Sequence, residues 1–332
     1  MPATSKRPLG VHLADSLEPE LRTSLESCLD PAIQLTTGDP PPAGASYEVL
    51  VAGRPSAQLL EASPRLRAVV IPYAGLARKP RELLLGYPAI TVHNLHHNAP
   101  ATAELALSLL LAAVKRIVPM DRALRAGDWR PRWAPQSALG LGNKTALVLG
   151  FGAIGRRVAE GCLGLGMSVI AVRRQAKGGE REGRVAVHPI AALPELLPKA
   201  HALVICLPLT PETEGLIGAR ELALLPEGAV LVNVGRGPIV DESALYDALV
   251  SGRLHSAGLD VWYRYPEDEA SRAHTLPATK PFHELDSVVL SPHRGGDNID
   301  TEAHWPEALA ALLNAAARGE PIPNRMDLAA GY

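Results

Sequence analysis

The chain has 332 residues, of which 47% are hydrophobic and 20% charged, and its formal net charge is -2. This length predicts two domains rather than one, and the composition is that of a globular protein able to bury sizeable cores. The near-neutral charge argues against nucleic acid or anionic membrane as a partner. Three scattered cysteines, the lack of a leader-like N-terminus and the lack of a long apolar stretch favour a cytoplasmic location.

Short apolar runs alternate with polar or helical stretches over residues 10–99, which predicts a first α/β unit. The Pro/Gly-rich segment 38–46 within it is expected to be a solvent loop. Residues 101–117, ATAELALSLLLAAVKRI, are strong helix formers, too apolar for a surface helix and too short for a membrane span. They predict a buried helix that joins two lobes.

A second series of apolar runs follows, with helix-length intervals between several of them. The runs are TALVLG, SVIAVRR, ALVICLP, AVLVNVG, HSAGLDVW and SVVLSPH, from residue 145 to residue 293. Apolar strands that alternate with helices predict a doubly wound, mostly parallel sheet.

A glycine-rich turn joins the first of these strands to a helix. Its sequence GFGAIG matches GxGxxG, with Gly150 for the tight turn, Gly152 for close approach of a pyrophosphate and Gly155 for packing of the helix on the strand. The helix N-terminus supplies N–H donors and positive potential. The strand before it and the helix after it are the context that a dinucleotide site requires, so the sequence predicts a dinucleotide cofactor.

The end of the next strand distinguishes the two nicotinamide cofactors. An acidic residue there would accept the ribose hydroxyls of NAD, but Arg173 and Arg174 stand in its place. Guanidinium groups suit the 2′-phosphate of NADP, which is the preferred prediction. A solvated basic turn with NAD bound is the alternative.

A set of motifs in order carries a resemblance over nearly the whole chain. ATAELALSLLLA, LVLGFGAIGRRVA, ICLPLTPETEGLIG, VLVNVGRGPIVDESAL, AGLDVW and SPHRGG together resemble the D-isomer-specific 2-hydroxyacid dehydrogenase family. The resemblance implies an α/β protein of two Rossmann-like domains with doubly wound parallel sheets. A substrate domain of residues 1–99 plus 299–332 would be split by an NAD(P)-binding domain of residues 100–298, and the protein would form a homodimer.

The same resemblance implies roles for single residues. Arg236 would bind the carboxylate of the substrate, and His293 would exchange the proton of its hydroxyl group, which suits a bidentate guanidinium and an imidazole that titrates near neutral pH. Backbone N–H groups of Ala74 and Gly75 would also face the carboxylate. Asp260 would hold the nicotinamide carboxamide, and the other expected cofactor contacts are Thr102, Ala153, Ile154, Leu207, Pro208, Thr213 and Val234.

One expected catalytic acid is missing. The family has a glutamate five residues after the aspartate of the GLDV segment, where this chain has Tyr265. A tyrosine hydroxyl can still orient the histidine, but it does not compensate the charge of an imidazolium, so a lower histidine pKa is expected. An acid among residues 267–269 is the alternative partner. Of the adjacent His96 and His97, one is a candidate for substrate binding or proton relay, the alternative being a solvent-facing loop; no metal site is expected.

These features favour a working reductase of a small 2-keto acid or D-2-hydroxy acid, of the glyoxylate or hydroxypyruvate reductase type, with NADP preferred over NAD. Oxidation of formate or phosphite is an alternative within the same superfamily. A catalytically weak scaffold that senses dinucleotides is an alternative from another class.

Overall fold

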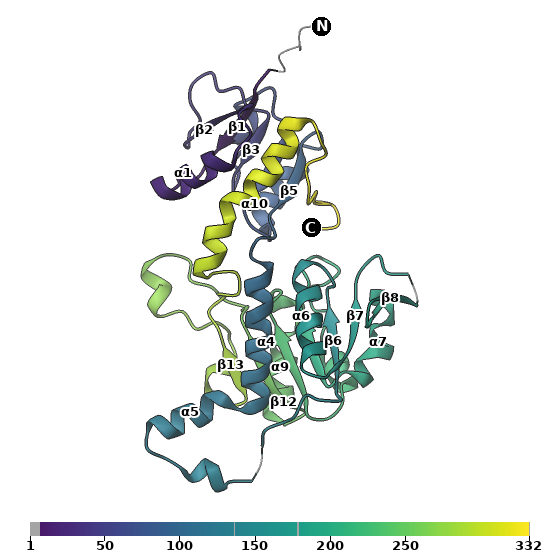
Figure 1. Cartoon of the computed structure of the whole chain (residues 1–332). Helices are drawn as coiled ribbons and strands as arrows, with labels where there is room; N and C mark the ends of the chain where they lie inside the picture. Colours follow the sequence, from purple (N-terminus) through teal and green to yellow (C-terminus); the bar gives the residue numbers. More distant parts are fainter. Residues whose placement is uncertain (1–6, 136, 178, 332) are drawn as a thin grey trace. The chain divides into compact units, whose positions relative to one another are not determined.

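The computed structural model describes residues 7–135, 137–177 and 179–331. Residues 1–6, on which the expected lack of a leader partly depends, lie outside this description. The chain divides into two compact units, the first formed by Met1–Asn98 with Asp297–Tyr332 and the second by Ala99–Gly296 (Figure 1). Among the described residues, no helix has both the length and the apolar content needed to cross a membrane.

The first unit is built on a parallel sheet with the strand order β2-β1-β3-β4-β5. Its elements are β1 (Leu9–Leu13), α1 (Pro19–Cys28), β2 (Ile33–Thr37), β3 (Val49–Val51), α2 (Ala57–Glu61), β4 (Ala68–Ile71), α3 (Arg78–Leu85), β5 (Thr91–Asn94) and α10 (Ile299–Arg318). Strands β1, β3 and β4 are buried along their whole length, as expected for a parallel sheet covered on both faces.

Helix α10 returns the end of the chain to this first unit, where it packs beside α1 (Figure 1). The helix begins at a side-chain cap, in which Asn298 accepts a hydrogen bond from the Thr301 N–H, and it ends at Gly319 in the left-handed conformation. The Asn314 amide ties it to α1 by donating to the Cys28 carbonyl at 2.9 Å. The first unit is therefore assembled from both ends of the sequence.

The second unit holds the larger sheet, with the order β13-β12-β11-β10-β6-β7-β9-β8. Its strands are β6 (Thr145–Leu149), β7 (Ser168–Val172), β8 (Glu180–Glu182), β9 (Val185–His188), β10 (Ala202–Ile205), β11 (Ala229–Asn233), β12 (Leu254–Leu259) and β13 (Val288–Leu290). Its α-helices are α4 (Ala99–Lys115), α5 (Ile117–Arg125), α6 (Ala153–Gly164), α7 (Leu193–Leu196), α8 (Ala219–Leu224) and α9 (Glu242–Val250). Short 3₁₀ helices are Arg130–Trp133, Ile190–Ala192, Leu197–Lys199, Gly237–Ile239, Ala270–Ala273 and Phe282–Glu284.

The strand register of this sheet aligns the C-terminal ends of its parallel strands with one another. The residues that pair with one another at these ends are Val172, Leu149, Ile205, Asn233, Leu259 and Leu290. These strands are parallel, so the loops that follow them all leave from the same edge of the sheet. The order reverses between β6 and β10, which is where ligands bind in open sheets of this kind.

The expected strands are confirmed, and two details differ from the expectation. The buried helix, expected over residues 101–117, is α4, and it ends because Arg116 takes the left-handed conformation with φ 58° before α5 begins. The hairpin β8–β9 is antiparallel and was not expected, because the polar sequence of β8 lacks an apolar run. The long segment after Trp262 is anchored in the core by the fully buried Phe282.

Candidate active site

In the loop after β6, Gly150, Gly152 and Gly155 have different structural roles. Gly150 has a φ of 96°, in the left-handed region that favours glycine, and a Cβ there would lie 2.8 Å from the Cys206 carbonyl oxygen. A Cβ at Gly155 would collide with the Gly150 carbonyl oxygen, so the helix packs on the loop more closely than another residue permits. At Gly152, the N-cap of α6, a Cβ would meet no atom within 4 Å. This open space beside a helix N-terminus fits an anionic phosphate.

The end of β7 differs from the sequence interpretation. Arg173 was expected to stand without a carboxylate, but its guanidinium donates to Glu182 at 2.7 Å and also to Glu180. Glu182 is shared with Arg156, on the first turn of α6, at 3.1 Å. The hairpin that sequence reasoning missed thus supplies two acids beside the glycine loop, and the expected basic patch is a mixed cluster of ion pairs.

Arg236 is positioned by the turn that follows β11. The Asn233 side chain accepts from the Gly235 N–H and donates to the Arg236 carbonyl, both at 3.0 Å. A Cβ at Gly237 would collide with the Trp262 backbone, which fixes this turn against the loop after β12. The Arg236 guanidinium donates to the Gly235 carbonyl at 2.7 Å and forms no salt bridge within the described part of the chain. Burial lowers its pKa, while Tyr265 and Asp260 oppose that shift.

His293 lies on the loop after β13, and Asp260 holds that loop in place. The buried Asp260 carboxylate accepts from the backbone N–H groups of Arg294 and Gly295, each at 2.9 Å, and from the Ser291 hydroxyl at 2.5 Å. His293 itself has a φ of 61°, an unusual backbone conformation for a residue other than glycine. The role expected for Asp260 toward nicotinamide stays a prediction, and the structure adds a positioning role that sequence reasoning missed.

Tyr265 lies beside His293, as the sequence suggested. The tyrosine hydroxyl is 3.0 Å from His293 Nδ1 and also accepts a hydrogen bond from the Trp262 N–H at 3.0 Å. The Trp262 N–H can only donate, so the hydroxyl keeps its own hydrogen and a second lone pair for Nδ1. It can therefore donate to a neutral imidazole or accept from an imidazolium. The role of Tyr265 in catalysis stays a prediction.

The pKa of His293 is lowered from its ordinary value, and the causes lie in the residues present. Partial loss of hydration among the surrounding protein atoms is the largest cause, and the positive charge of Arg236 also lowers the pKa. Asp260 raises it in part. Arg236, Asp260, Tyr265 and His293 therefore form one electrostatic group at the edge of the sheet.

The alternative acids after Tyr265 are engaged elsewhere. Asp268 accepts from the Ser271 N–H at 2.8 Å, and Glu269 pairs with Arg272 at 3.4 Å. Glu267 is exposed. No hydrogen bond or ion pair in the described segments joins any of the three to His293. Trp262, whose indole donates to the Ser291 carbonyl at 2.8 Å, is buried and belongs to the core.

The other expected cofactor contacts lie on the same edge of the sheet or close to it. Leu207 and Pro208 follow β10, and Val234 follows β11. The Thr213 hydroxyl donates to the Pro208 carbonyl at 2.7 Å, so it shapes the loop after β10. Thr102, on the first turns of α4, is buried, and a Cβ at Gly295 would lie 3.2 Å from its methyl group.

The remaining candidates belong to the first unit. The Ala74 carbonyl accepts from the Asn94 amide at 2.7 Å, while the N–H groups of Ala74 and Gly75 have no acceptor among the described residues. His96 is exposed, whereas Nδ1 of His97 is buried without a hydrogen-bond partner in the described part of the chain. Nearby protein atoms that partly exclude water lower the pKa of both histidines, and His96 lowers that of His97 further. Their roles toward a substrate stay predictions.

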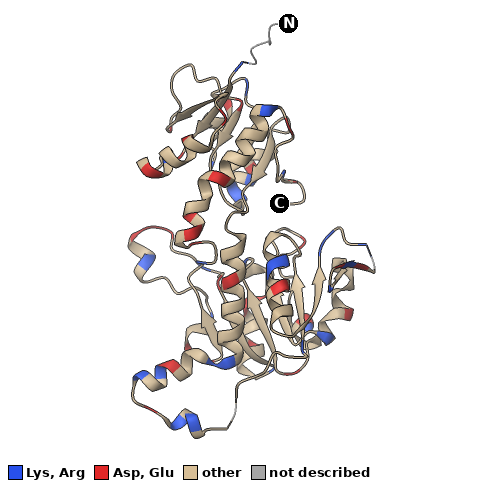
Figure 2. Cartoon of the chain, viewed as in Figure 1, with Lys and Arg blue, Asp and Glu red and all other residues tan. Residues whose placement is uncertain are grey.

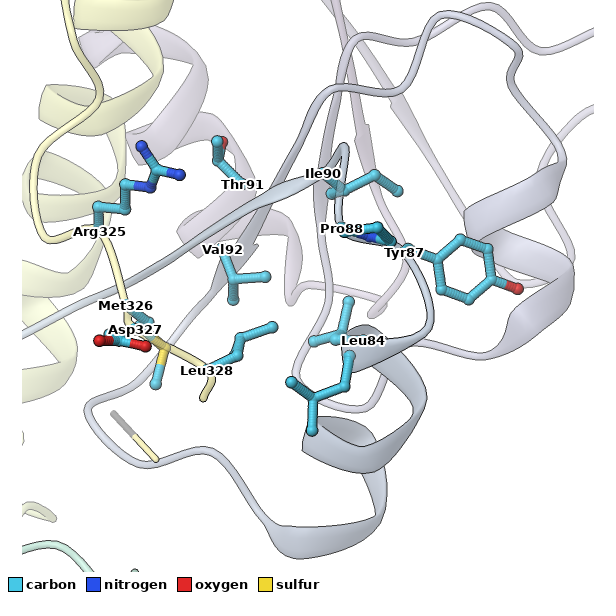
Figure 3. A pocket seen from close by; sticks show the side chains of 11 residues that line it. Leu84, Tyr87, Pro88, Ile90, Thr91, Val92, Arg325, Met326, Asp327 and Leu328 are labelled. Carbon is cyan, nitrogen blue, oxygen red and sulfur yellow. The ribbon is translucent and has the colours of Figure 1, made fainter. Parts of the chain in front are cut away.

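The first unit also contains a surface pocket of about 460 Å³, which the sequence did not indicate (Figure 3). It lies between α3, β5 and the segment 325–328, which is held by a hydrogen bond from Arg81 to the Leu328 carbonyl at 2.9 Å. Its lining is largely apolar, with Arg325 and Asp327 as its charged members. None of the expected catalytic or cofactor residues lines it.

Comparisons with known proteins agree with this fold. A family model described as the NAD binding domain of D-isomer specific 2-hydroxyacid dehydrogenases matches residues 107–295. The chain is 37% identical over 287 residues to a glyoxylate reductase of Aeropyrum pernix, covering 85% of this chain and 82% of that protein. Among solved structures, a D-isomer specific 2-hydroxyacid dehydrogenase of Xanthobacter autotrophicus Py2 in complex with NADPH and MES is similar with a TM-score of 0.78 and 26% identity, covering 98% of this chain and 100% of that one.

A probable 2-hydroxyacid dehydrogenase of Rhizobium etli CFN 42, in complex with NADP, HEPES and L(+)-tartaric acid, is similar with a TM-score of 0.77 and 25% identity, covering 98% of this chain and 100% of that one. The chain belongs to the D-isomer specific 2-hydroxyacid dehydrogenase family. It is an oxidoreductase that depends on a nicotinamide dinucleotide and acts on the CH–OH group of a small acid.

Proposed function

We propose that the protein is a reductase of small 2-keto acids, of the glyoxylate reductase type, that prefers NADPH. Arg236 carries this proposal, because its partly buried guanidinium forms no salt bridge in the described part of the chain. A cation that is partly withdrawn from water without a carboxylate partner is costly unless an anion joins it. The carboxylate of a 2-keto acid supplies that anion in bidentate geometry.

The protein groups divide the remaining work. A nicotinamide cofactor held at Gly150, Gly152 and Gly155 would supply the hydride. Protonated His293 gives the proton to the oxygen that becomes the hydroxyl group, and Tyr265 orients the imidazole. Asp260 keeps the loop of His293 in place through the N–H groups of Arg294 and Gly295.

Preference for NADPH is supported by Arg173 at the end of β7 and by the cofactors bound in two relatives of known structure. We further infer a homodimer, in which two copies cover the apolar side chains of α5 and the adjoining 3₁₀ helix. Helix α5 buries no residue of its own, and Trp133 next to it is 75% exposed.

The test is oxidation of NADPH and NADH with a panel that includes glyoxylate, hydroxypyruvate and larger 2-keto acids. We expect activity with a small member and a higher kcat/KM with NADPH. In Arg236→Gln, kcat/KM should fall by about 30-fold or more, because the loss of a buried charge-assisted contact is typically worth about 2 to 5 kcal/mol. The exposed Arg220→Gln serves as the control. Inactivity of the natural protein with every keto acid, despite binding of the cofactor, would favour the scaffold alternative.

A further inference from the structure

We propose that Glu180 and Glu182 limit the affinity for NADPH, because they occupy the guanidinium group that the 2′-phosphate of NADP requires. The proposal rests on the proposed function only in taking the glycine loop as the dinucleotide site. It assigns the two acids a role that the sequence motifs do not, since the hairpin that carries them lies outside those motifs.

The geometry of the hairpin places Glu180 and Glu182 on the same face of the sheet. Side chains alternate along a strand, so Glu180 and Glu182 share one face of β8 while Arg181 lies on the other. Their cross-strand partners are Val187 and Val185. These valines are buried against α6, which places the two acids on the face of the sheet where α6 begins.

The four charged side chains alternate in sign. Glu182 bridges Arg156 and Arg173, and Arg173 in turn reaches Glu180. In Figure 2, red is seen on β8 and blue on the loop that leads into it. The cluster of two arginines and two glutamates therefore has no net charge, although the sequence at the end of β7 contains only basic residues.

The two cofactors make opposite demands on such a cluster. A phosphate monoester brings a charge of about -1.5 to -2 at neutral pH, which the arginines attract and the glutamates repel. NADPH must therefore displace at least one carboxylate from Arg173. NADH has two ribose hydroxyls at that position, and carboxylates accept hydrogen bonds from them.

Displacement is physically accessible. The side chains of Arg173, Glu180 and Glu182 keep 28%, 30% and 31% of their surface exposed, so water can solvate a released carboxylate. Strand β8 is the last of its sheet and pairs with β9 alone. Partly exposed ion pairs are worth little, typically below about 1 kcal/mol, so a bound phosphate can outcompete them.

The experiment measures the dissociation constants of NADPH and NADH for the natural protein and for Glu180→Gln, Glu182→Gln and the double variant. The double variant should bind NADPH about fivefold more tightly or better, with NADH unchanged or weaker. Adenosine 2′,5′-bisphosphate and AMP serve as probes of the same subsite and should show the same contrast. Glu227→Gln removes an exposed carboxylate elsewhere in the second unit and should change neither constant.

A coupling test assigns the effect to the guanidinium group. In an Arg173→Gln background, the two glutamate substitutions should no longer tighten NADPH. An unchanged ratio of the NADPH and NADH constants in the double variant would overturn the proposal, as would loss of both cofactors from a folded double variant. If the double variant does not fold, the same criteria apply to the single ones. A natural protein that prefers NADH would refute the NADPH preference, while tighter NADPH binding by the variants would still support the role of the two acids.

Discussion

At the scale of residues, Tyr265 determines how His293 can handle a proton. Its oxygen accepts from the Trp262 N–H, and its second lone pair can accept from Nδ1–H when the imidazole is protonated. Oxidation of an alcohol leaves His293 as an imidazolium. A glutamate at position 265 would compensate that positive charge and the neutral tyrosine does not, so tyrosine favours reduction over oxidation.

The pH dependence of reduction tests this role. Reduction requires protonated His293, whose pKa is lowered from its ordinary value of 6.5 by partial burial and by Arg236. Activity of the natural protein should therefore decline as pH rises through that lowered pKa. In Tyr265→Glu, the new carboxylate stabilises the imidazolium and raises its pKa, so the decline should move to higher pH and the ratio of oxidation to reduction should rise. The measurement is kcat/KM against pH in both directions.

Tyr265→Phe separates orientation from charge. It keeps the ring and removes the hydroxyl group, so kcat should fall by roughly tenfold while the decline with pH does not move upward. Profiles of the natural protein and Tyr265→Glu that superimpose would show that residue 265 does not act on His293.

At the scale of elements, the loop between β6 and α6 contains one glycine whose substitution should affect cofactor binding and another whose substitution should affect stability. A Cβ at Gly152 meets open space, and its φ of -95° is allowed for alanine, whereas a Cβ at Gly155 collides with the Gly150 carbonyl. Gly152→Ala should therefore weaken NADPH binding by about tenfold or more, because the methyl group takes the space of the pyrophosphate. Its unfolding free energy should fall by about 0.5 to 1 kcal/mol, the cost of alanine at an N-cap.

Gly155→Ala is the matched variant in the same loop. It should lower the unfolding free energy by about 1 to 3 kcal/mol, because the helix must move away from the loop. Denaturant unfolding and cofactor titration of both variants check the pair. Equal stability losses in the two variants would contradict the assignment of the open space to a ligand.

The central strands of both sheets could be predicted because they are continuous apolar runs, and the glycine loop because an apolar strand precedes it and a helix follows it. The contact of Tyr265 with His293 was implied by the family resemblance, in which a glutamate at this position pairs with the histidine. The hairpin β8–β9 could not be predicted in this way. Its first strand is Glu-Arg-Glu, a polar alternation that does not predict a strand until the partner strand β9 is known. The partners of Arg173 and the loop-holding role of Asp260 depend on the same long-range packing.

At the scale of the whole molecule, the second unit carries an apolar surface that its own chain does not cover. Ile117, Met120 and Leu124 follow the spacing of one helical face on α5, and they are 53%, 38% and 51% exposed. Trp129 and Trp133 continue this surface at 58% and 75% exposure. Aromatic residues and methionine, with arginines nearby, are the composition of interface centres (Figure 2).

A second copy of the chain is the partner we expect on this surface, because a two-fold axis lets the same patch cover itself. The natural protein should therefore have twice the 35.2 kDa mass of one chain in light scattering at micromolar concentration. Leu124→Glu combined with Trp133→Glu buries charges in that interface and should yield monomers. Leu276→Glu places the same charge on another apolar side chain that is 54% exposed, and it should leave the dimer intact. A natural protein that is monomeric throughout the micromolar range, or a double variant that remains dimeric, would place the association surface elsewhere or remove it altogether.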